Sequence, residues 1–461
     1  MGVAFARRIF PRVAAMVAAA VSFLPASPAQ IYPGSASRYA HGYVDTVYRS
    51  RWSEGESDQD LYQYWDVEME ELVPGHARGA FSLRLNTDIN GRVDHAPGLG
   101  EYIFDRDPFY SVDDSRDEEY VDLYTGYVDL YNGSPANGYL RIGRQYMSEF
   151  DWIQVDGVSV NLPVTSWAKV LGYFGQAVSY YSGHTDDWSG GIGLELKPGI
   201  GSRWLFEIHR YEDDIADNDS WKAEVWQRLW EGAFFHARFR GLDGEARDLW
   251  LDVSQYIAPM DLTLFLNYRR LFTNLEDESR QDSPLYRSGL LEQNAHNYFS
   301  VGFDKALPCN FGLSGGLDIQ RVGDHSQDYG DRDYEHGNVT LSYYPSRVWR
   351  YSVSGEWWNT DPESSSYGMS GEVGYSPTKC IDWTLGTSYT SYVFRYEEER
   401  AFPNPNFPAV LYRETPFVKT YYTGLRWKVN ECNDLRVNFE IEDDDQDNDY
   451  YTLRVKWGQT F

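Results

Sequence analysis

The chain ends in Tyr450-Tyr451-Thr452-Leu453-Arg454-Val455-Lys456-Trp457-Gly458-Gln459-Thr460-Phe461. The apolar and aromatic residues of this stretch share one parity, namely Tyr451, Leu453, Val455, Trp457 and Phe461. The other parity holds Thr452, Arg454, Lys456 and Thr460. Successive side chains of a β-strand point to opposite faces, so the stretch predicts a strand with one apolar aromatic face and one charged face.

This final strand resembles the last strand of Gram-negative outer-membrane β-barrels, which alternates in the same way and ends in Phe. In those proteins the barrel assembly machinery reads the last strand, so the resemblance implies that Trp457 and Phe461 form the assembly signal. It also implies contact with outer-membrane lipid and a location in the cell outer membrane. A soluble β-sandwich that ends on an amphipathic strand is the alternative.

The N-terminus has the features of a secretory signal peptide. Three arginines within positions 7–12 precede a small apolar run at 13–24, and small residues surround a cleavage point after Ala29. The apolar run is too short to remain in a bilayer as an anchor. The sequence therefore predicts an exported protein with a cleaved signal peptide at 1–29 and a single transmembrane β-barrel domain at 30–461.

The composition fits a barrel with a polar interior. The 461 residues are 16% aromatic but only 42% hydrophobic, and the formal net charge is −29. Half of each strand is polar in a membrane barrel with a solvated interior, and aromatic girdles mark both interfaces. No stretch after the N-terminus approaches 18 apolar residues, which argues against a transmembrane helix. The three cysteines form no CxxC, which argues against a disulfide scaffold or a c-type haem attached to this chain.

Alternating segments of about ten residues recur from residue 38 onward, the length that a tilted strand needs to cross a bilayer. Residues 311–319 and 349–357 show the pattern clearly, with mostly apolar residues at odd positions and small or polar residues at even positions. We count about 22 such segments, with an uncertainty of about two. Residues 204–250 are the hardest to divide, because two hairpins run together there.

The connectors between these segments alternate between two kinds. Tight turns such as 132–138 and 307–310 alternate with longer acidic connectors. The longer connectors include 53–60, 88–119, 212–219, 274–294, 395–416 and 443–449. Outer-membrane barrels have short periplasmic turns and longer outer loops. The predicted fold is therefore all-β, a transmembrane antiparallel β-barrel of about 22 strands (20–22) with no plug domain.

Charged residues of the polar parity are candidates for the lumen wall, because a charge that faces lipid costs a few kcal/mol. They are either a solute path that sets selectivity or charges that pair across neighbouring strands in a solvated lumen. The candidates are Arg84, Arg141, Arg144, Glu207, Glu224, Arg228, Arg238, Arg350, Glu356, Glu372, Arg426, Arg436, Glu440 and Arg454.

Arg141 and Arg144 belong to this set because of a short motif. The stretch Leu140-Arg141-Ile142-Gly143-Arg144-Gln145 resembles the Gly-Arg-Gln strand of several porin-like families. In those families arginines of this strand line the constriction, which the resemblance implies for both residues. The alternative is a strand end with one arginine that faces outward at the level of the lipid headgroups.

Two long loops carry further candidates. The loop at 88–119 is rich in aromatic residues, and either folds inward as a constriction or packs on itself or on a partner. Its constriction candidates are Tyr102, Phe104, Phe109 and Tyr110. No metal site is predicted, although Asp443, Asp445, Asp447 and Asp449 resemble a Ca²⁺ loop by carboxylate density. That stretch lacks the Gly and distal Glu of an EF-hand, and a solvated acidic tip is the alternative.

These features predict an outer-membrane channel for small hydrophilic solutes or ions, with a polar lumen of mixed charge. A wide barrel without a plug also fits a sheath that holds a partner. The stretches Tyr48-Arg49-Ser50-Arg51-Trp52 and 60–67 resemble the opening hairpin of δ-proteobacterial barrels in porin–cytochrome conduits. This second resemblance implies a periplasmic or lipoprotein multihaem cytochrome as partner, for electron transfer across the outer membrane.

An enzyme is not expected, because HExxH does not occur. No cofactor of the chain itself is predicted, and nucleic acid is not an expected partner.

Overall fold

The computed structural model describes residues 40–53, 56–89, 119–150, 153–178, 188–212, 217–273, 295–323, 333–360, 364–397, 411–414, 417–444 and 449–461. Strands make up nearly all of these residues. In chain order they are β1 (Ala40–Ser53), β2 (Glu56–Val73), β3 (Ala77–Asp88), β4 (Glu119–Tyr131), β5 (Tyr139–Met147), β6 (Ile153–Pro163), β7 (Ala168–Ala177), β8 (Trp188–Leu196), β9 (Ser202–Glu212), β10 (Asp217–Trp230), β11 (Ala233–Leu242), β12 (Glu245–Ile257), β13 (Leu262–Leu271), β14 (His296–Leu307), β15 (Phe311–Val322), β16 (Tyr334–Tyr343), β17 (Trp349–Thr360), β18 (Ser364–Thr378), β19 (Ile381–Glu397), β20 (Leu411–Glu414), β21 (Phe417–Lys428), β22 (Asn433–Asp444) and β23 (Asp449–Thr460).

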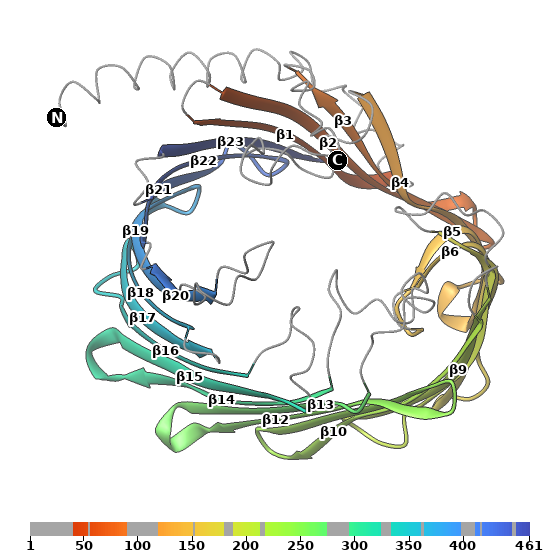
Figure 1. Cartoon of the computed structure of the whole chain (residues 1–461). Coiled ribbons are helices and arrows are strands. Elements are labelled where there is room, and N and C mark those ends of the chain that lie inside the picture. The colour runs from red at the N-terminus through yellow and green to blue at the C-terminus, as the bar shows by residue number, and fades with distance from the viewer. Residues whose placement is uncertain are drawn as a thin grey trace, which may run out of the picture.

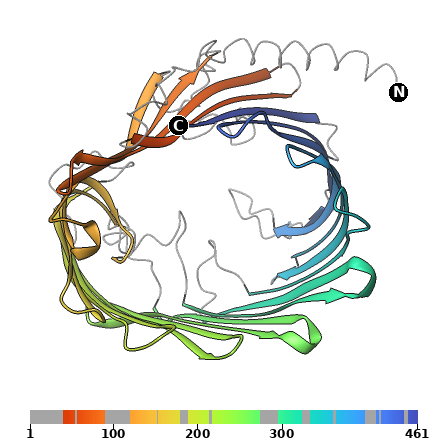
Figure 2. The same ribbon diagram turned by 180° about the vertical axis from the view of Figure 1, so that it is seen from behind.

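The strands form one closed ring. Apart from β20, each strand pairs in antiparallel fashion with its neighbours in the chain, and β1 pairs with both β2 and β23 (Figures 1 and 2). Phe461 completes the seam, because its N–H donates to the Gly42 carbonyl at 3.0 Å and its carbonyl accepts from the Gly42 N–H at 3.1 Å. Closure leaves no unpaired sheet edge, which a lipid-exposed sheet requires.

The ring contains 22 strands in the part of the chain that the structure describes, which confirms the predicted antiparallel barrel without a plug. The short strand β20 is not a member, because it pairs only with the end of β19 at Phe394–Glu397. Figure 1 shows β20 inside the ring. The region 204–250, which is hard to divide into strands from the sequence, contains a turn at Glu231 and Gly232 between β10 and β11.

Turns at one end of the barrel are tight throughout. Three of them contain a short 3₁₀ helix, at Pro135–Asn137, Ala258–Met260 and Pro308–Asn310. No helix among the described residues is both long enough and apolar enough to cross a membrane.

The connectors at the other end are less uniform than predicted. Only positions 54–55 separate β1 from β2, and 213–216 separate β9 from β10, because the strands themselves extend into the acidic stretches. The connector between β11 and β12 is the two-residue turn Asp243–Gly244, with positive φ at both positions (53° and 84°). Positive φ at both central residues is typical of a type I′ hairpin, which matches the twist of antiparallel strands.

Glycines allow the sheet to curve between β5 and β7. Gly143 pairs with Gly157, which pairs with Gly175 on the next strand. A Cβ at Gly143 would lie 2.2 Å from the Gly126 carbonyl oxygen, and the φ of Gly143 is +127°. At these three glycines the neighbouring backbones lie too close for a side chain. The ring curves at β5 and β6, on the right of Figure 1.

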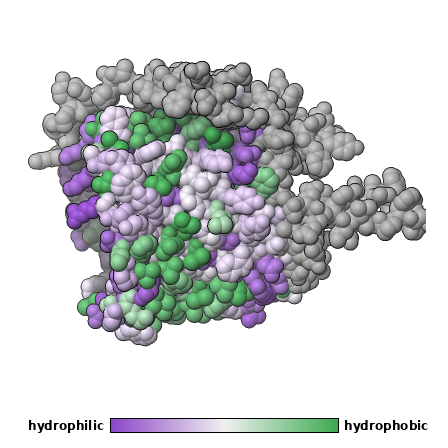
Figure 3. All heavy atoms as spheres, turned by 90° about the vertical axis from the view of Figure 1, so that its left-hand side faces the viewer, coloured by the Kyte–Doolittle hydropathy of each residue, from purple (hydrophilic) through white to green (hydrophobic). Residues whose placement is uncertain are grey.

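The outer surface is apolar between its two ends. Figure 3 shows mainly apolar and near-neutral residues on the face formed by the strands at the left of Figure 1, with strongly hydrophilic residues toward both ends of the barrel. Elsewhere on the outer surface, Phe174 of β7 and Ile192 of β8 are 59% and 63% exposed. A face of this kind is suited to lipid.

Several predictions fall on residues that the structure does not describe. These are the signal peptide at 1–29, the constriction candidates Tyr102, Phe104, Phe109 and Tyr110, and the two acidic residues Asp445 and Asp447.

Candidate functional site: the inner face of the barrel

Cross-strand partners share a face of a sheet, so the register assigns each side chain to one side of the ring. We call the side opposite Phe174 and Ile192 the inner face. The predicted lumen residues on the inner face are Arg84, Arg141, Glu207, Glu224, Arg228, Arg238, Arg350, Glu356, Glu372, Arg426, Arg436, Glu440 and Arg454. Their placement follows from strand parity, and their roles in transport remain predictions.

Arg144 lies on the outer face, unlike Arg141. Its neighbours of the same parity, Leu140 and Ile142, are exposed apolar side chains. Its guanidinium forms a bidentate pair with Asp156 on β6, with Nε–Oδ1 at 2.8 Å and Nη2–Oδ2 at 2.6 Å. A spacing of three residues along a strand always places two side chains on opposite faces, so the sequence itself contained this distinction.

A buried carboxylate organises the inner face of β3 to β5. Asp129 is fully buried and accepts hydrogen bonds from Arg78 Nε at 2.8 Å and from Arg141 Nε at 2.6 Å. The Arg141 guanidinium also lies over the Tyr127 ring, 3.6 Å from its centroid. Charge-assisted hydrogen bonds and a cation–π contact together hold both arginines against the wall.

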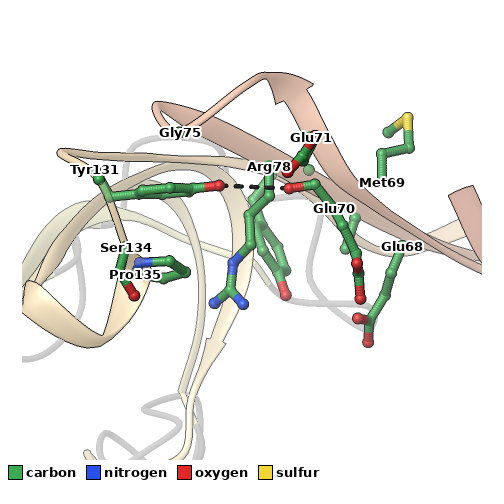
Figure 4. A pocket seen from close by; sticks show the side chains of 13 residues that line it. Glu68, Met69, Glu70, Glu71, Gly75, Arg78, Tyr131, Ser134 and Pro135 are labelled. Carbon is green, nitrogen blue, oxygen red and sulfur yellow. Dashed lines mark hydrogen bonds between the residues drawn. The ribbon is translucent and has the colours of Figure 1, made fainter. Parts of the chain in front are cut away.

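A cavity of about 400 Å³ lies beside this cluster, at the tight-turn end of the barrel. Figure 4 shows Arg78 reaching into it past Glu68 and Glu70, while the Tyr131 hydroxyl donates to the Glu70 carbonyl at 3.4 Å. The register shifts between Met69 and Val73, which makes a bulge that brings these acidic residues to the rim. No sequence motif predicts this cavity, although the acidic residues within 68–71 mark its position.

The inner face of β1 to β4 carries further ion pairs between strands. Arg49 Nη2 lies 2.6 Å from Asp60 Oδ2, and Arg84 Nη2 lies 2.9 Å from Asp122 Oδ2. Arg51 pairs with Asp58 next to the first pair. These cations therefore have partners within the wall.

The turn after β5 folds inward and packs on the wall. Phe150 is 1% exposed, and its ring centroid lies 4.7 Å from that of Tyr173, a residue of the inner face. The Glu149 carbonyl accepts a hydrogen bond from Lys222 Nζ, which also lies 2.8 Å from Glu207 Oε1. An apolar cluster that includes Leu171, Tyr173 and Leu205 lies beneath the turn. The turn thus occupies part of the interior next to β7, β9 and β10.

A polar network continues from this turn along β10 to β13. His236 connects two acids, with Nε2 at 2.7 Å from Glu224 Oε1 and Nδ1 at 2.9 Å from Asp252 Oδ2. Its ring also stacks on Trp226, with centroids 5.1 Å apart. Arg240 Nη2 lies 2.7 Å from Asp248 Oδ2. Because the network joins four strands, it rigidifies this part of the wall.

The inner face of β17 to β23 also carries polar contacts between strands. Arg350 Nη1 lies 3.4 Å from Asp382 Oδ2, and Arg350 Nη2 donates to Thr384 Oγ1 at 2.9 Å. The Tyr422 hydroxyl donates to Glu372 Oε2 at 3.0 Å. A hollow of about 490 Å³ lies next to these residues, lined by Arg426, Arg436 and Arg454 among others.

Two other predicted sites are partly visible. Asp443 and Asp449 face each other as the last pair of β22 and β23. Within the described ranges, no group of three or more His, Cys, Asp or Glu side chains is arranged to hold a metal ion. Trp457 lies on the outer face at the seam, opposite Thr46 of β1.

No protein-family model matches the chain. No curated protein matches it either. Among solved structures, the translocation pore of the P pilus usher PapC is similar with a TM-score of 0.52 and 8% identity, over 92% of this chain and 100% of that chain. The outer membrane protein opdK from Pseudomonas aeruginosa is similar with a TM-score of 0.40 and 10% identity, over 92% of this chain and 100% of that chain. OccAB4 from Acinetobacter baumannii is similar with a TM-score of 0.42 and 12% identity, over 92% of this chain and 97% of that chain. At this identity the likeness to the PapC pore concerns architecture alone, and what the two chains share is a closed antiparallel β-barrel.

Proposed function

We propose that this protein is an outer-membrane channel through which small hydrophilic solutes or ions pass. The observation that carries the proposal is the division of the ring into two faces. The outer face presents exposed apolar side chains, whereas the inner face carries charged residues on nearly every strand. Charges at membrane depth are tolerated where they face water or one another, so this division favours a hydrated interior.

Residues 1–29 are then the export signal of this channel, and the mature barrel begins at Gln30. The last strand of the barrel, with Trp457 and the final residue Phe461, is the part that the barrel assembly machinery recognises. Outer-membrane lipid surrounds the apolar outer face.

Conductance in a planar bilayer tests the proposal. Purified full-length barrel, shown to be folded by its β-type circular-dichroism spectrum, is added to a bilayer in KCl. A channel gives stepwise insertions with ohmic current. Folded barrel that inserts into lipid vesicles but carries no current would exclude the channel.

A second candidate is a sheath around a partner protein, and barrel width favours it. Barrels of 22 strands normally hold a plug domain, and no plug domain is present among the described residues. The resemblance of 60–67 to the hairpin of porin–cytochrome barrels makes a multihaem cytochrome the partner to examine. Barrel isolated from native membranes with stoichiometric haem absorbance supports the sheath, and a haem-free conducting barrel supports the channel.

A further inference from the structure

Cations of the inner face fall into two groups. On β1 to β5 each arginine of the inner face has a carboxylate partner, such as Asp60 for Arg49 and Asp129 for Arg141. Arg426 on β21 and Arg454 on β23 differ, because neither has a hydrogen bond, an ion pair or a ring contact with any residue that the structure describes. The paired arginines are already satisfied by the wall, and these two are not.

The register places Arg426 and Arg454 among other cations. Arg426 is directly opposite Asp382 on β19, whose carboxylate contacts Arg350 and Ser376. On its other side Arg426 is directly opposite Arg436, which is directly opposite Lys456 on the next strand. Like charges in directly opposite positions destabilise a sheet. Arg436 and Lys456 have acidic partners, at 2.8 Å in Asp434 and at 2.6 Å in Asp45. Among the cations that line the hollow, Arg426 and Arg454 are therefore the two without an ion pair to a described residue.

Both Arg426 and Arg454 line the hollow of about 490 Å³. The polar residues Thr384, Asn438 and Thr452 contribute to the lining. Pockets for organic ligands typically measure about 300–1,000 Å³. The hollow is therefore of a size for a molecule with several carbon atoms rather than for a single inorganic ion.

We propose that this hollow binds small organic anions that carry carboxylate or phosphate groups, and that it selects them during passage. The inference rests on the proposed channel function. A guanidinium presents two parallel N–H donors that match the oxygens of a carboxylate or phosphate. An anion in the hollow supplies acceptors for these two guanidinium groups, which have no acceptor among the described residues. Asp382 and Glu440 also line the hollow and limit the positive charge there.

Binding is measured by isothermal titration calorimetry on the full-length barrel in detergent, with succinate, glycerol 3-phosphate and putrescine as probes. We expect the two anions to bind and the dication not to bind. Arg426→Gln and Arg454→Gln each remove charge-assisted hydrogen bonds and are expected to weaken anion binding about tenfold or more. The two organic anions distinguish a carboxylate site from a phosphate site.

Arg228→Gln is the matched control, because Arg228 is exposed on the inner face of β10 and does not line the hollow. We expect it to leave the affinity unchanged. The inference is overturned if neither anion binds, if putrescine binds as tightly, or if the control weakens binding as much as the two variants do. Bilayer current separates this result from the proposed function. A conducting barrel without anion binding refutes only the site, and a barrel that binds anions without conducting refutes only the channel.

Discussion

At the scale of single residues, the charged side chains of the inner face are of two kinds: those paired with another residue of the wall, and those without such a partner. Asp129 is fully buried between Arg78 and Arg141, so its carboxylate compensates two cations at once. Breaking a buried ion pair leaves an uncompensated charge and costs about 3–5 kcal/mol. We expect Asp129→Asn to lower the free energy of unfolding by an amount in this range, measured by guanidinium unfolding of the barrel in lipid vesicles.

The matched variant is Asp217→Asn. Asp217 lies 3.0 Å from Arg210, but the two side chains are 57% and 43% exposed at the end of the barrel. Pairs exposed to this extent contribute about 0–1 kcal/mol. Equal denaturation midpoints for the two variants would contradict the structural role of Asp129.

Residue-scale prediction from the sequence succeeded where parity alone decides the answer. Alternation assigned Arg84, Glu207 and Arg454 to the polar face, and the register places all three on the inner face, while their role in the lumen stays a prediction. Motif likeness placed Arg144 with Arg141, but parity separates them, and parity is physically the stronger argument. Which arginines have partners depends on residues of neighbouring strands, so that distinction required the register.

At the scale of elements, the inward turn after β5 narrows the interior on one side. Phe150 anchors the turn against Tyr173, with Lys222 as a second anchor through the Glu149 carbonyl. Loss of a buried Phe ring costs about 3–5 kcal/mol. The ring of strands closes without this turn, so we expect Phe150→Ala to release the turn and raise the single-channel conductance.

Phe174→Ala is the control for this prediction, because Phe174 is the neighbour of Tyr173 on β7 and lies exposed on the outer face. Its removal touches lipid contacts and leaves the interior as it is. Unchanged conductance in Phe150→Ala, or an equal rise in both variants, would argue against a turn that narrows the channel.

The glycine row across β5 to β7 makes a second prediction at this scale. Alanine at Gly143 combines an unfavourable φ of +127° with a Cβ 2.2 Å from the Gly126 oxygen. We expect Gly143→Ala to cost about 2–4 kcal/mol and to reduce the folded fraction, measured as the heat-modifiable band in gel electrophoresis. Gly312→Ala meets its nearest atom only at 3.9 Å and is expected to fold normally.

Element boundaries were predictable only in part. The alternation of residues 311–319 and 349–357 marked β15 and β17 correctly, because both faces of these strands are uniform. The central region was not divisible, since Glu231 and Gly232 form a turn too short to interrupt the pattern. The inward turn at Phe150 had no periodic signal, because its burial arises from contacts with β7 and β9.

At the scale of the whole molecule, every inference depends on which face meets lipid. Val339 and Asn338 are consecutive residues in the middle of β16, so they lie at the same depth and differ only in face. Val339 is 47% exposed on the outer face, whereas Asn338 is on the inner face opposite Glu356. A lysine that faces lipid near the midplane costs about 2–4 kcal/mol, and a lysine in the lumen does not.

We therefore expect Val339→Lys to lower the free energy of unfolding in lipid vesicles by about 2–4 kcal/mol and Asn338→Lys to leave it nearly unchanged. The same pair in detergent provides the control for side-chain volume, because micelles adapt to a charge more readily than a bilayer does. Equal effects of the two lysines in vesicles would mean that the apolar face does not meet lipid. A reversed order would mean that the charged face does, and neither the channel nor its anion site would then remain tenable.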